Sequence, residues 1–281
     1  MNRAEIIDNI YKCVKNDTYR LKNINIDDKI KMFGFDDYGY ISRDIIDLKH
    51  DKIDIKIQTL RNTKLTQQEE NEIKIVYHKA YENIISKKFA KDIISLKGYQ
   101  LCPYCRAGYV SLIKINDKYI RPDLDHFYPK SKHYYLSITI DNLIPGCLLC
   151  NQRLKKDIDP SIDFKNTQEI FKKIKFEVDI INKYIYIINL DEFNKNEYEW
   201  IENMCISKIY SYHTEIFDNI YEKYKKYRKS NIKDMAKALN LDEEYIKNLI
   251  FWEFKIMKEK NEPLYKLKQD IFNQIMQICF I

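Results

Sequence analysis

Residues 102–105 read C-P-Y-C, and residues 147–150 read C-L-L-C. Two cysteines at this spacing form either a dithiol redox centre or one half of a zinc site. A redox centre needs one pair and a thioredoxin-like strand–motif–helix arrangement, which the flanking sequence does not predict, so a thiol oxidoreductase is the weaker alternative. Two pairs supply the four thiolates of a closed tetrahedral site. We therefore expect one structural Zn²⁺, bound by Cys102, Cys105, Cys147 and Cys150.

The segment between the two cysteine pairs carries polar residues in a particular order. It contains R-P-D-L-D-H-F-Y-P-K at 121–130 and D-N-L-I-P at 141–145, and Asn151 directly follows the last cysteine. This order resembles the HNH endonucleases, a branch of the His-Me finger (ββα-metal) superfamily. The resemblance covers about residues 101–156 and rests on Asp125, His126, Pro129, Asn142 and Asn151.

The chemistry of these residue types agrees with the resemblance. Hydrolysis of a phosphodiester needs an activated water, and a neutral imidazole such as that of His126 suits a general base. Asp125 and the side-chain carbonyl of Asn151 are hard oxygen donors, which suit one catalytic Mg²⁺ that keeps waters and a phosphate as its other ligands, with Mn²⁺ as a substitute. The resemblance also implies that Asn142 helps to orient the histidine. The zinc would fix the helix that starts near Asn151 against the preceding hairpin.

Neighbouring polar residues are expected to have secondary roles. Asp123 is predicted to support the hairpin rather than bind metal, and His133 to lie at the surface or contact substrate. Many members of the family have a lysine three residues after the closing Asn or His, where this chain has Leu154. The phosphate contact could instead come from Arg153, Lys155 or Lys156.

Composition limits the class of protein. The chain has 281 residues, of which 45% are hydrophobic and 32% charged, as in soluble globular proteins. No apolar run is long enough to span a bilayer, and the N-terminus M-N-R-A-E-I-I lacks a signal-peptide pattern. An odd number of cysteines, seven, argues against a disulfide framework, so we expect a cytoplasmic protein. Three further cysteines are predicted to be packing residues: Cys13, Cys205 and Cys279.

The sequence predicts an α+β protein in which a zinc-braced ββα-metal module is inserted between two mainly helical regions. Residues 1–97 form the first helical region, 98–160 the nuclease module and 161–281 the second helical region. A capping box at Thr66 and Glu69 starts one helix, followed by a buried stripe at helical spacing. The stripe consists of Ile73, Val76, Tyr77, Ala80 and Ile84.

Two β-hairpins are also expected. In the module, residues 110–115 and a short run to Ile120 flank an Asn116-Asp117 turn. In the C-terminal region, residues 176–181 and 184–188 flank an Asn-Lys turn.

The C-terminal helices offer two weaker signals for nucleic-acid binding. Residues 219–229 interleave basic residues with tyrosines, which suits either a strand-tracking surface or an ordinary solvated face. Residues 232–250 have the pattern of a helix-turn-helix, but the second helix opens with Asp-Glu-Glu, which would repel phosphates. Two packed helices are the favoured interpretation there.

The sequence therefore predicts a metal-dependent HNH endonuclease that cleaves DNA, with RNA as the alternative substrate. A helical region followed by a zinc-braced module is also similar to nucleases that act as effectors in bacterial anti-phage defence, some of which work beside an ATPase subunit. The net charge of +6 is compatible with a phosphate-rich partner. The main competing hypothesis is a non-catalytic zinc module that binds nucleic acid or a protein partner.

Overall fold

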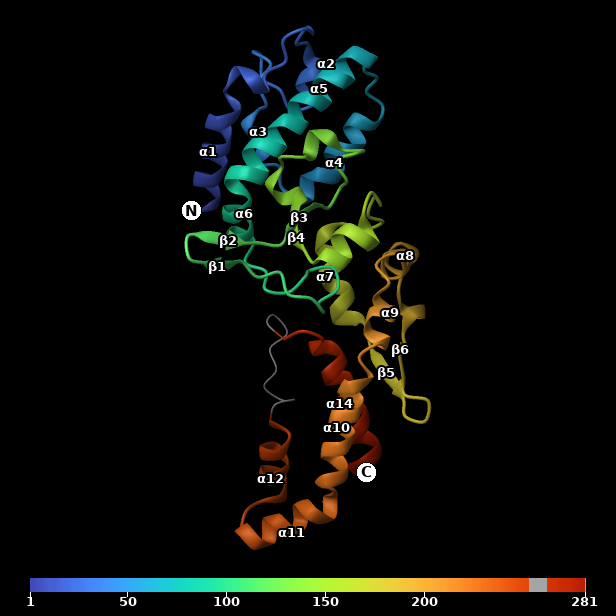
Figure 1. Ribbon diagram of the computed structural model, residues 1–281. Coiled ribbons are helices and arrows are strands. Elements are labelled where there is room, and N and C mark those ends of the chain that lie inside the picture. Colours follow the sequence, from blue (N-terminus) through green and yellow to red (C-terminus); the bar gives the residue numbers. More distant parts are fainter. Residues whose placement is uncertain (253–261, 281) are drawn as a thin grey trace. The chain divides into compact units, whose positions relative to one another are not determined.

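The computed structural model describes residues 1–252 and 262–280, and of Cys279 and Phe280 only the backbone. The chain divides into two compact units. Unit 1 comprises Met1–Pro103 and Val110–Lys165, and unit 2 comprises Tyr104–Tyr109 and Asn166–Ile281. Helices and small antiparallel sheets occur together, as expected for an α+β protein (Figure 1). Within the described ranges, no helix has the length and apolar character needed to cross a membrane.

The N-terminal part of unit 1 is helical, as predicted. The capping box of Thr66 and Glu69 is present, and the five residues of the predicted stripe are all buried. The helical segments in this part are α1 (Arg3–Val14), α2 (Asp28–Lys31), α3 (Arg43–Ile46), α4 (His50–Arg61), α5 (Gln67–Ala80), the π-helical η2 (Tyr81–Phe89) and α6 (Ala90–Lys97).

A glycine permits a close approach between α5 and the loop before α3. Gly34 has a φ of +87°, and a Cβ atom there would lie 2.7 Å from Ile45 Cβ and 2.8 Å from the Tyr77 hydroxyl. The same hydroxyl donates a hydrogen bond to the carbonyl of Phe33 at 2.7 Å. Any larger residue at position 34 would therefore be strained and would push α5 away from this loop.

Two antiparallel hairpins follow in unit 1. The first pairs β1 (Ile113–Ile115) with β2 (Lys118–Ile120), and Asn116 takes the left-handed conformation in the predicted turn. The second pairs β3 (Asp123–His126) with β4 (Leu143–Gly146), so that His126 lies opposite Leu143. Three short helical segments complete this part: η3 (Tyr134–Leu136), η4 (Ile140–Asn142) and the π-helical η5 (Leu149–Lys155).

Unit 2 contains the second predicted hairpin, formed by β5 (Phe176–Asp179) and β6 (Tyr184–Ile187). The backbone N–H groups of Phe176 and Val178 donate to Asp270 and Gln274, so side chains of α14 satisfy the free edge of β5. The helical segments are α7 (Phe164–Lys173), which begins in unit 1, η6 (Leu190–Glu192), α8 (Lys195–Asn203), α9 (Ile206–Ser211), α10 (Thr214–Lys226), α11 (Lys229–Leu239), α12 (Glu243–Ile250) and α14 (Tyr265–Phe280).

The isolated cysteines have modest burial. Cys13 and Cys205 are half-buried thiols that form no disulfide. The prediction for the Cys279 side chain lies outside the described residues.

Candidate metal centre and active site

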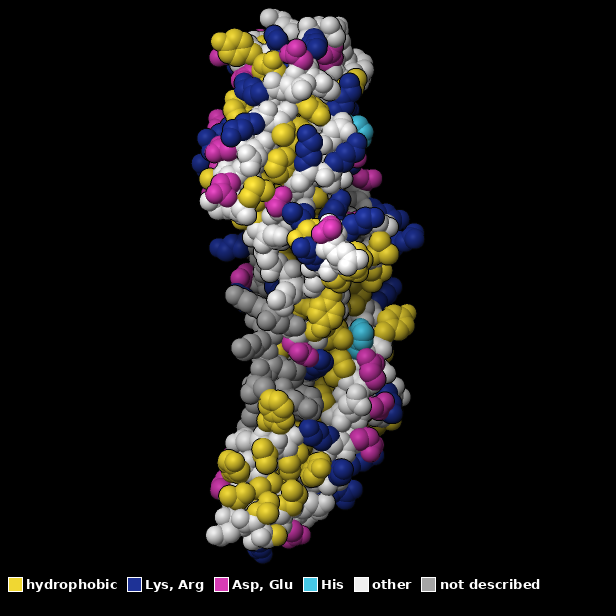
Figure 2. All heavy atoms as spheres, turned by 60° about the vertical axis from the view of Figure 1, so that its left-hand side comes forward, with side chains coloured by type: hydrophobic (Ala, Val, Ile, Leu, Met, Phe, Trp, Pro, Cys, Tyr) yellow, Lys and Arg dark blue, Asp and Glu magenta, His cyan; other side chains and the backbone are white. Residues whose placement is uncertain are grey.

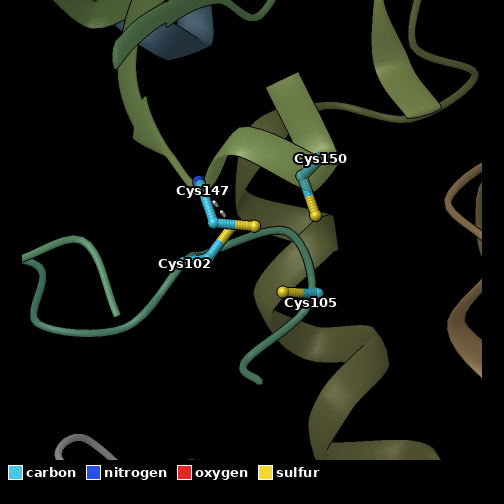
Figure 3. A group of neighbouring side chains, drawn as sticks. All are labelled: Cys102, Cys105, Cys147 and Cys150. Carbon is cyan, nitrogen blue, oxygen red and sulfur yellow. Dashed lines mark hydrogen bonds between the residues drawn. The ribbon is translucent and has the colours of Figure 1, made fainter. Parts of the chain in front are cut away.

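The four predicted zinc ligands lie together. The Sγ atoms of Cys102, Cys105, Cys147 and Cys150 are all within 4.8 Å of one another, and Figure 3 shows them gathered around a common centre. Four sulfurs about 2.3 Å from one tetrahedral ion would be about 3.8 Å apart, so a small contraction closes the site. The donor set and its spacing therefore fit Zn²⁺.

Backbone contacts prepare the cysteines for this arrangement. The N–H of Cys147 donates to the Sγ of Cys102 at 3.4 Å (Figure 3). The N–H of Val110 donates to the carbonyl of Gln100 at 2.9 Å, which closes the loop that carries the first cysteine pair. The N–H group at Cys102 Sγ offsets part of the negative charge of that thiolate, and the closed loop holds the first cysteine pair in place.

After the first hairpin, β3 is followed by the short segments η3 and η4, then by its partner strand β4, and then by η5. Asp123 links β3 to η5, because its Oδ2 accepts hydrogen bonds from Asn151 Nδ2 at 3.2 Å and from Gln152 Nε2 at 2.7 Å. These contacts tie the start of β3 to η5. The helix that carries Asn151 is thus held against the strand that carries Asp125 and His126.

His126 is buried at the end of β3, with 7% of its surface exposed. Its Nε2 lies 3.0 Å from the carbonyl oxygen of Ser137, and its ring centroid is 4.5 Å from that of Tyr81. A carbonyl only accepts, so Nε2 carries the proton and Nδ1 keeps its lone pair. Burial lowers the pKa of His126 to about 3, which keeps the imidazole neutral at physiological pH. The lone pair at Nδ1 can accept a hydrogen bond, but a pKa this low opposes protonation of the ring and makes it a weak general base.

Asp125 is paired with a lysine. Lys155 Nζ lies 3.1 Å from Asp125 Oδ2 and donates a second bond to the carbonyl of His126 at 2.7 Å. Lys155 is fully buried and Asp125 is 5% exposed. The prediction that Lys155 could contact phosphate is therefore wrong, because its ammonium points into the protein. Arg153 and Lys156 are exposed and stay available for that role.

Asn142 is fully buried and braces the loop after His126. Its Oδ1 accepts from the N–H of Tyr128 at 2.8 Å, and its Nδ2 donates to the carbonyls of Tyr128 at 3.1 Å and Leu136 at 3.2 Å. The next residue, Ser137, supplies the carbonyl that holds His126. Asn142 thus braces the loop whose Ser137 carbonyl accepts from the imidazole.

The two residues expected to bind Mg²⁺ are not arranged as ligands. The Asp125 carboxylate faces the ammonium of Lys155, and the Asn151 amide donates to Asp123. In the part of the chain that the structure describes, the cysteine cluster is the one group of three or more His, Cys, Asp or Glu residues close enough to share an ion. As arranged, these residues do not fit a magnesium ion, because a buried ammonium already balances the carboxylate.

The two C-terminal segments differ in surface character. On α10, Lys225 lies 4.8 Å above the Tyr221 ring and pairs with Glu222, so part of the basic stretch is engaged locally. The predicted helix pair is formed by α11 and α12, and Figure 2 shows hydrophobic side chains gathered over it. A surface of this kind does not suit phosphate contact. Its exposed apolar residues are Leu239, Leu241, Tyr245, Leu249 and Trp252.

Comparison of the chain with protein-family models, with curated proteins and with solved structures found no match. The site must therefore be interpreted from its own geometry and from the motif.

Proposed function

We propose that unit 1 carries an endonuclease of the HNH kind, which hydrolyses phosphodiester bonds in DNA. The observation that supports this best is the state of His126 at the end of β3. Its Nε2 donates to the Ser137 carbonyl, which leaves the lone pair of the neutral ring at Nδ1, and its backbone carbonyl accepts from Lys155 of η5. The proposal extends to an anti-phage role beside an ATPase subunit, which rests on the resemblance alone.

In this proposal each residue of the chain has a distinct task. His126 Nδ1 takes the proton of the attacking water, and Ser137 holds the ring in the required tautomer. Arg153 and Lys156, exposed on and just after η5, are placed to meet a phosphate. A divalent ion, where bound, would stabilise charge on the phosphate. Asp125 could hold that ion only after the Lys155 ammonium moves away.

The burial of His126 and Asp125 favours a second candidate function. Because His126 is almost inaccessible and Asp125 is balanced by Lys155, the module also suits a non-catalytic zinc domain that binds nucleic acid or a protein. This candidate needs the cysteines but not the imidazole.

A nuclease assay separates the two candidates. Purified protein is incubated with plasmid, single-stranded DNA and RNA, with Mg²⁺, with Mn²⁺ or with neither, beside His126→Ala. His78→Ala, an exposed histidine on α5, is the matched control. We expect metal-dependent cleavage by the wild type and by His78→Ala, and its loss in His126→Ala. Equal metal-dependent cleavage by all three proteins would show that His126 is not the base, and no cleavage by any of them would favour the non-catalytic module.

A further inference from the structure

Unit 1 contains a cavity of about 580 Å³, lined by a different set of residues from the cysteine cluster. This volume lies within the ~300–1,000 Å³ typical of small-molecule sites. Its lining includes the end of α4 and several residues of the loop 128–135 that follows His126. The cavity is thus built partly by the loop that Asn142 braces.

Aromatic rings make up much of the lining, and they come from Phe33, Tyr128, Tyr134 and Tyr135. Phe33 and Tyr134 are parallel, with centroids 6.3 Å apart. Tyr135 meets both of these rings edge-on, at 5.7 and 5.6 Å. These contacts fix the rings in place. Phe33, Tyr128 and Tyr135 are at most 7% exposed, and the Lys74 ammonium lies 5.3 Å from the centroid of the Tyr134 ring, so Tyr134 is the ring most open to a planar ligand.

The polar groups of the cavity are held in fixed orientations. Tyr128 donates its hydroxyl proton to Asp54 at 2.5 Å. His133 Nε2 lies 3.0 Å from Asp159, and a carboxylate only accepts, so this nitrogen carries the proton. His133 Nδ1 then accepts from the Tyr135 hydroxyl at 3.2 Å. Burial lowers the pKa of His133, which agrees with a neutral ring.

The charges in the cavity favour a ligand whose neutral part lies inside the cavity and whose negatively charged part stays outside it. Three carboxylates line it, those of Asp54, Glu70 and Asp159, against two cations, Lys132 and Arg61. A phosphate inside would meet more negative than positive charge. Arg61 is exposed and forms no ion pair with the described residues, so it can meet a phosphate at the rim.

We propose that this cavity binds the base of an unpaired nucleotide in the nucleic acid that the nuclease cleaves. A base is planar, neutral and rich in N–H donors. Its N–H groups can donate hydrogen bonds to the carboxylates of the cavity while its ring stacks on the aromatic side chains. Arg61 contacts the flanking phosphate. The proposal rests on the proposed function and adds that the substrate has single-stranded or flipped-out character at this point.

Binding without cleavage tests the proposal. The full-length zinc-loaded chain, without added Mg²⁺ or Mn²⁺, is titrated with a fluorescent single-stranded DNA oligonucleotide, and with the same oligonucleotide lacking its bases. We expect Tyr134→Leu to bind the normal oligonucleotide about 5- to 150-fold more weakly, which corresponds to the loss of one stacked base. Arg61→Gln should reduce the salt dependence of binding by about one phosphate contact. Tyr119→Leu removes an exposed tyrosine of β2 outside the cavity and is the matched control.

Several outcomes decide the matter. Equal binding of the base-free oligonucleotide, or equal binding by Tyr134→Leu and Tyr119→Leu, overturns the base-binding cavity even if the wild type cleaves DNA. If Tyr134→Leu is less folded by circular dichroism, the comparison passes to Arg61→Gln, whose side chain is exposed. Base-dependent binding with no cleavage in Mg²⁺ or Mn²⁺ supports the cavity and overturns the nuclease.

Discussion

The ammonium of Lys155 and the carboxylate of Asp125 lie 3.1 Å apart, and both side chains are buried. Lys155 also donates to the carbonyl of His126, so one cation joins η5 to two consecutive residues of β3. A buried ion pair of this kind is costly to break from one side, because the remaining charge keeps its desolvation cost. The pair is therefore a structural link and, at the same time, a competitor for any metal that Asp125 would bind.

Replacing the lysine should separate these two effects. We expect Lys155→Met to lower the free energy of unfolding by about 3–5 kcal/mol, because the Asp125 carboxylate loses its ammonium partner. The double variant Asp125→Asn/Lys155→Met should regain most of that loss. Urea denaturation of the wild type, Asp125→Asn, Lys155→Met and the double variant measures this cycle. If Mg²⁺ uses Asp125, added Mg²⁺ should stabilise Lys155→Met more than the wild type, and an equal response would remove Asp125 from the proposed metal ligands.

The cysteine cluster predicts a stoichiometric metal. The purified chain should contain about one zinc per molecule, and Cys147→Ser should reduce both zinc content and thermal stability, since the site contributes folding free energy. Cys13→Ser changes a half-buried thiol outside the cluster and should keep its zinc. Metal analysis and thermal melts provide the measurements. A chain without zinc, in which the cysteine pairs oxidise readily, would point back to redox chemistry.

Stability should depend on pH through a half-buried histidine. Burial lowers the pKa of His50, whose ring stacks on Phe164 at 5.2 Å beside Asp141, Lys97 and Arg3. Below about pH 6.5 the unfolded chain binds a proton on this histidine while the folded chain resists it, so the free energy of unfolding should fall as pH drops. His50→Phe keeps an aromatic ring without a titrating group. The free energy of unfolding of His50→Phe should fall less steeply with decreasing pH than that of the wild type. The two slopes should differ by a fraction of the ~1.4 kcal/mol per pH unit that one proton gives.

Urea denaturation from pH 8 to about pH 5 measures these slopes, with His78→Gln as the control for removing an exposed histidine. Identical slopes for His50→Phe and the wild type would contradict the role of His50.

Asn142 should behave as a brace. Asn142→Ala leaves the backbone groups of Tyr128 and Leu136 without their partner in a buried place, which should lower the free energy of unfolding by about 2–4 kcal/mol. Asn71→Ala, on the exposed face of α5, should change it by less than about 0.5 kcal/mol. Urea titrations check both values. Near-normal stability of Asn142→Ala would mean that the loop is held by other contacts.

The features that sequence reasoning located best depend on local chemistry. The capping box at Thr66 and the turn at Asn116 need only neighbouring residues, and the cysteines reveal themselves through their spacing. The burial of Lys155 could not be predicted, because the run R-L-K-K-D at 153–157 has the composition of a surface. Whether Lys155 or Lys156 turns inward depends on how η5 packs against β3, which is set by contacts distant in sequence.

The sequence does not predict the cavity either, because its lining residues are far apart along the chain. His133 alone suggested a surface or substrate-contacting residue, while its partner Asp159 is 26 positions away. No periodic pattern connects the loop 128–135 with the end of α4. The identities of these residues are readable in the sequence, but their convergence is a result of the fold.

The last prediction concerns the proton acceptor. If His126 is the general base of the proposed nuclease, His126→Ala should lower cleavage by about 10²–10⁴-fold. The variant also loses the contact with Tyr81 and the bond to Ser137, so reduced activity alone would not separate catalysis from packing. Added imidazole resolves this, since it can occupy the space left by the ring and accept the proton itself.

Cleavage by His126→Ala should therefore rise with imidazole concentration, whereas cleavage by Lys155→Met should not, because that variant retains its histidine. Activity is measured on single-stranded DNA under saturating metal, with folding checked by circular dichroism. A folded His126→Ala protein that cleaves at the wild-type rate would show that His126 is not the base. A folded but inactive variant that imidazole does not restore would assign His126 a structural role, as the non-catalytic zinc module requires.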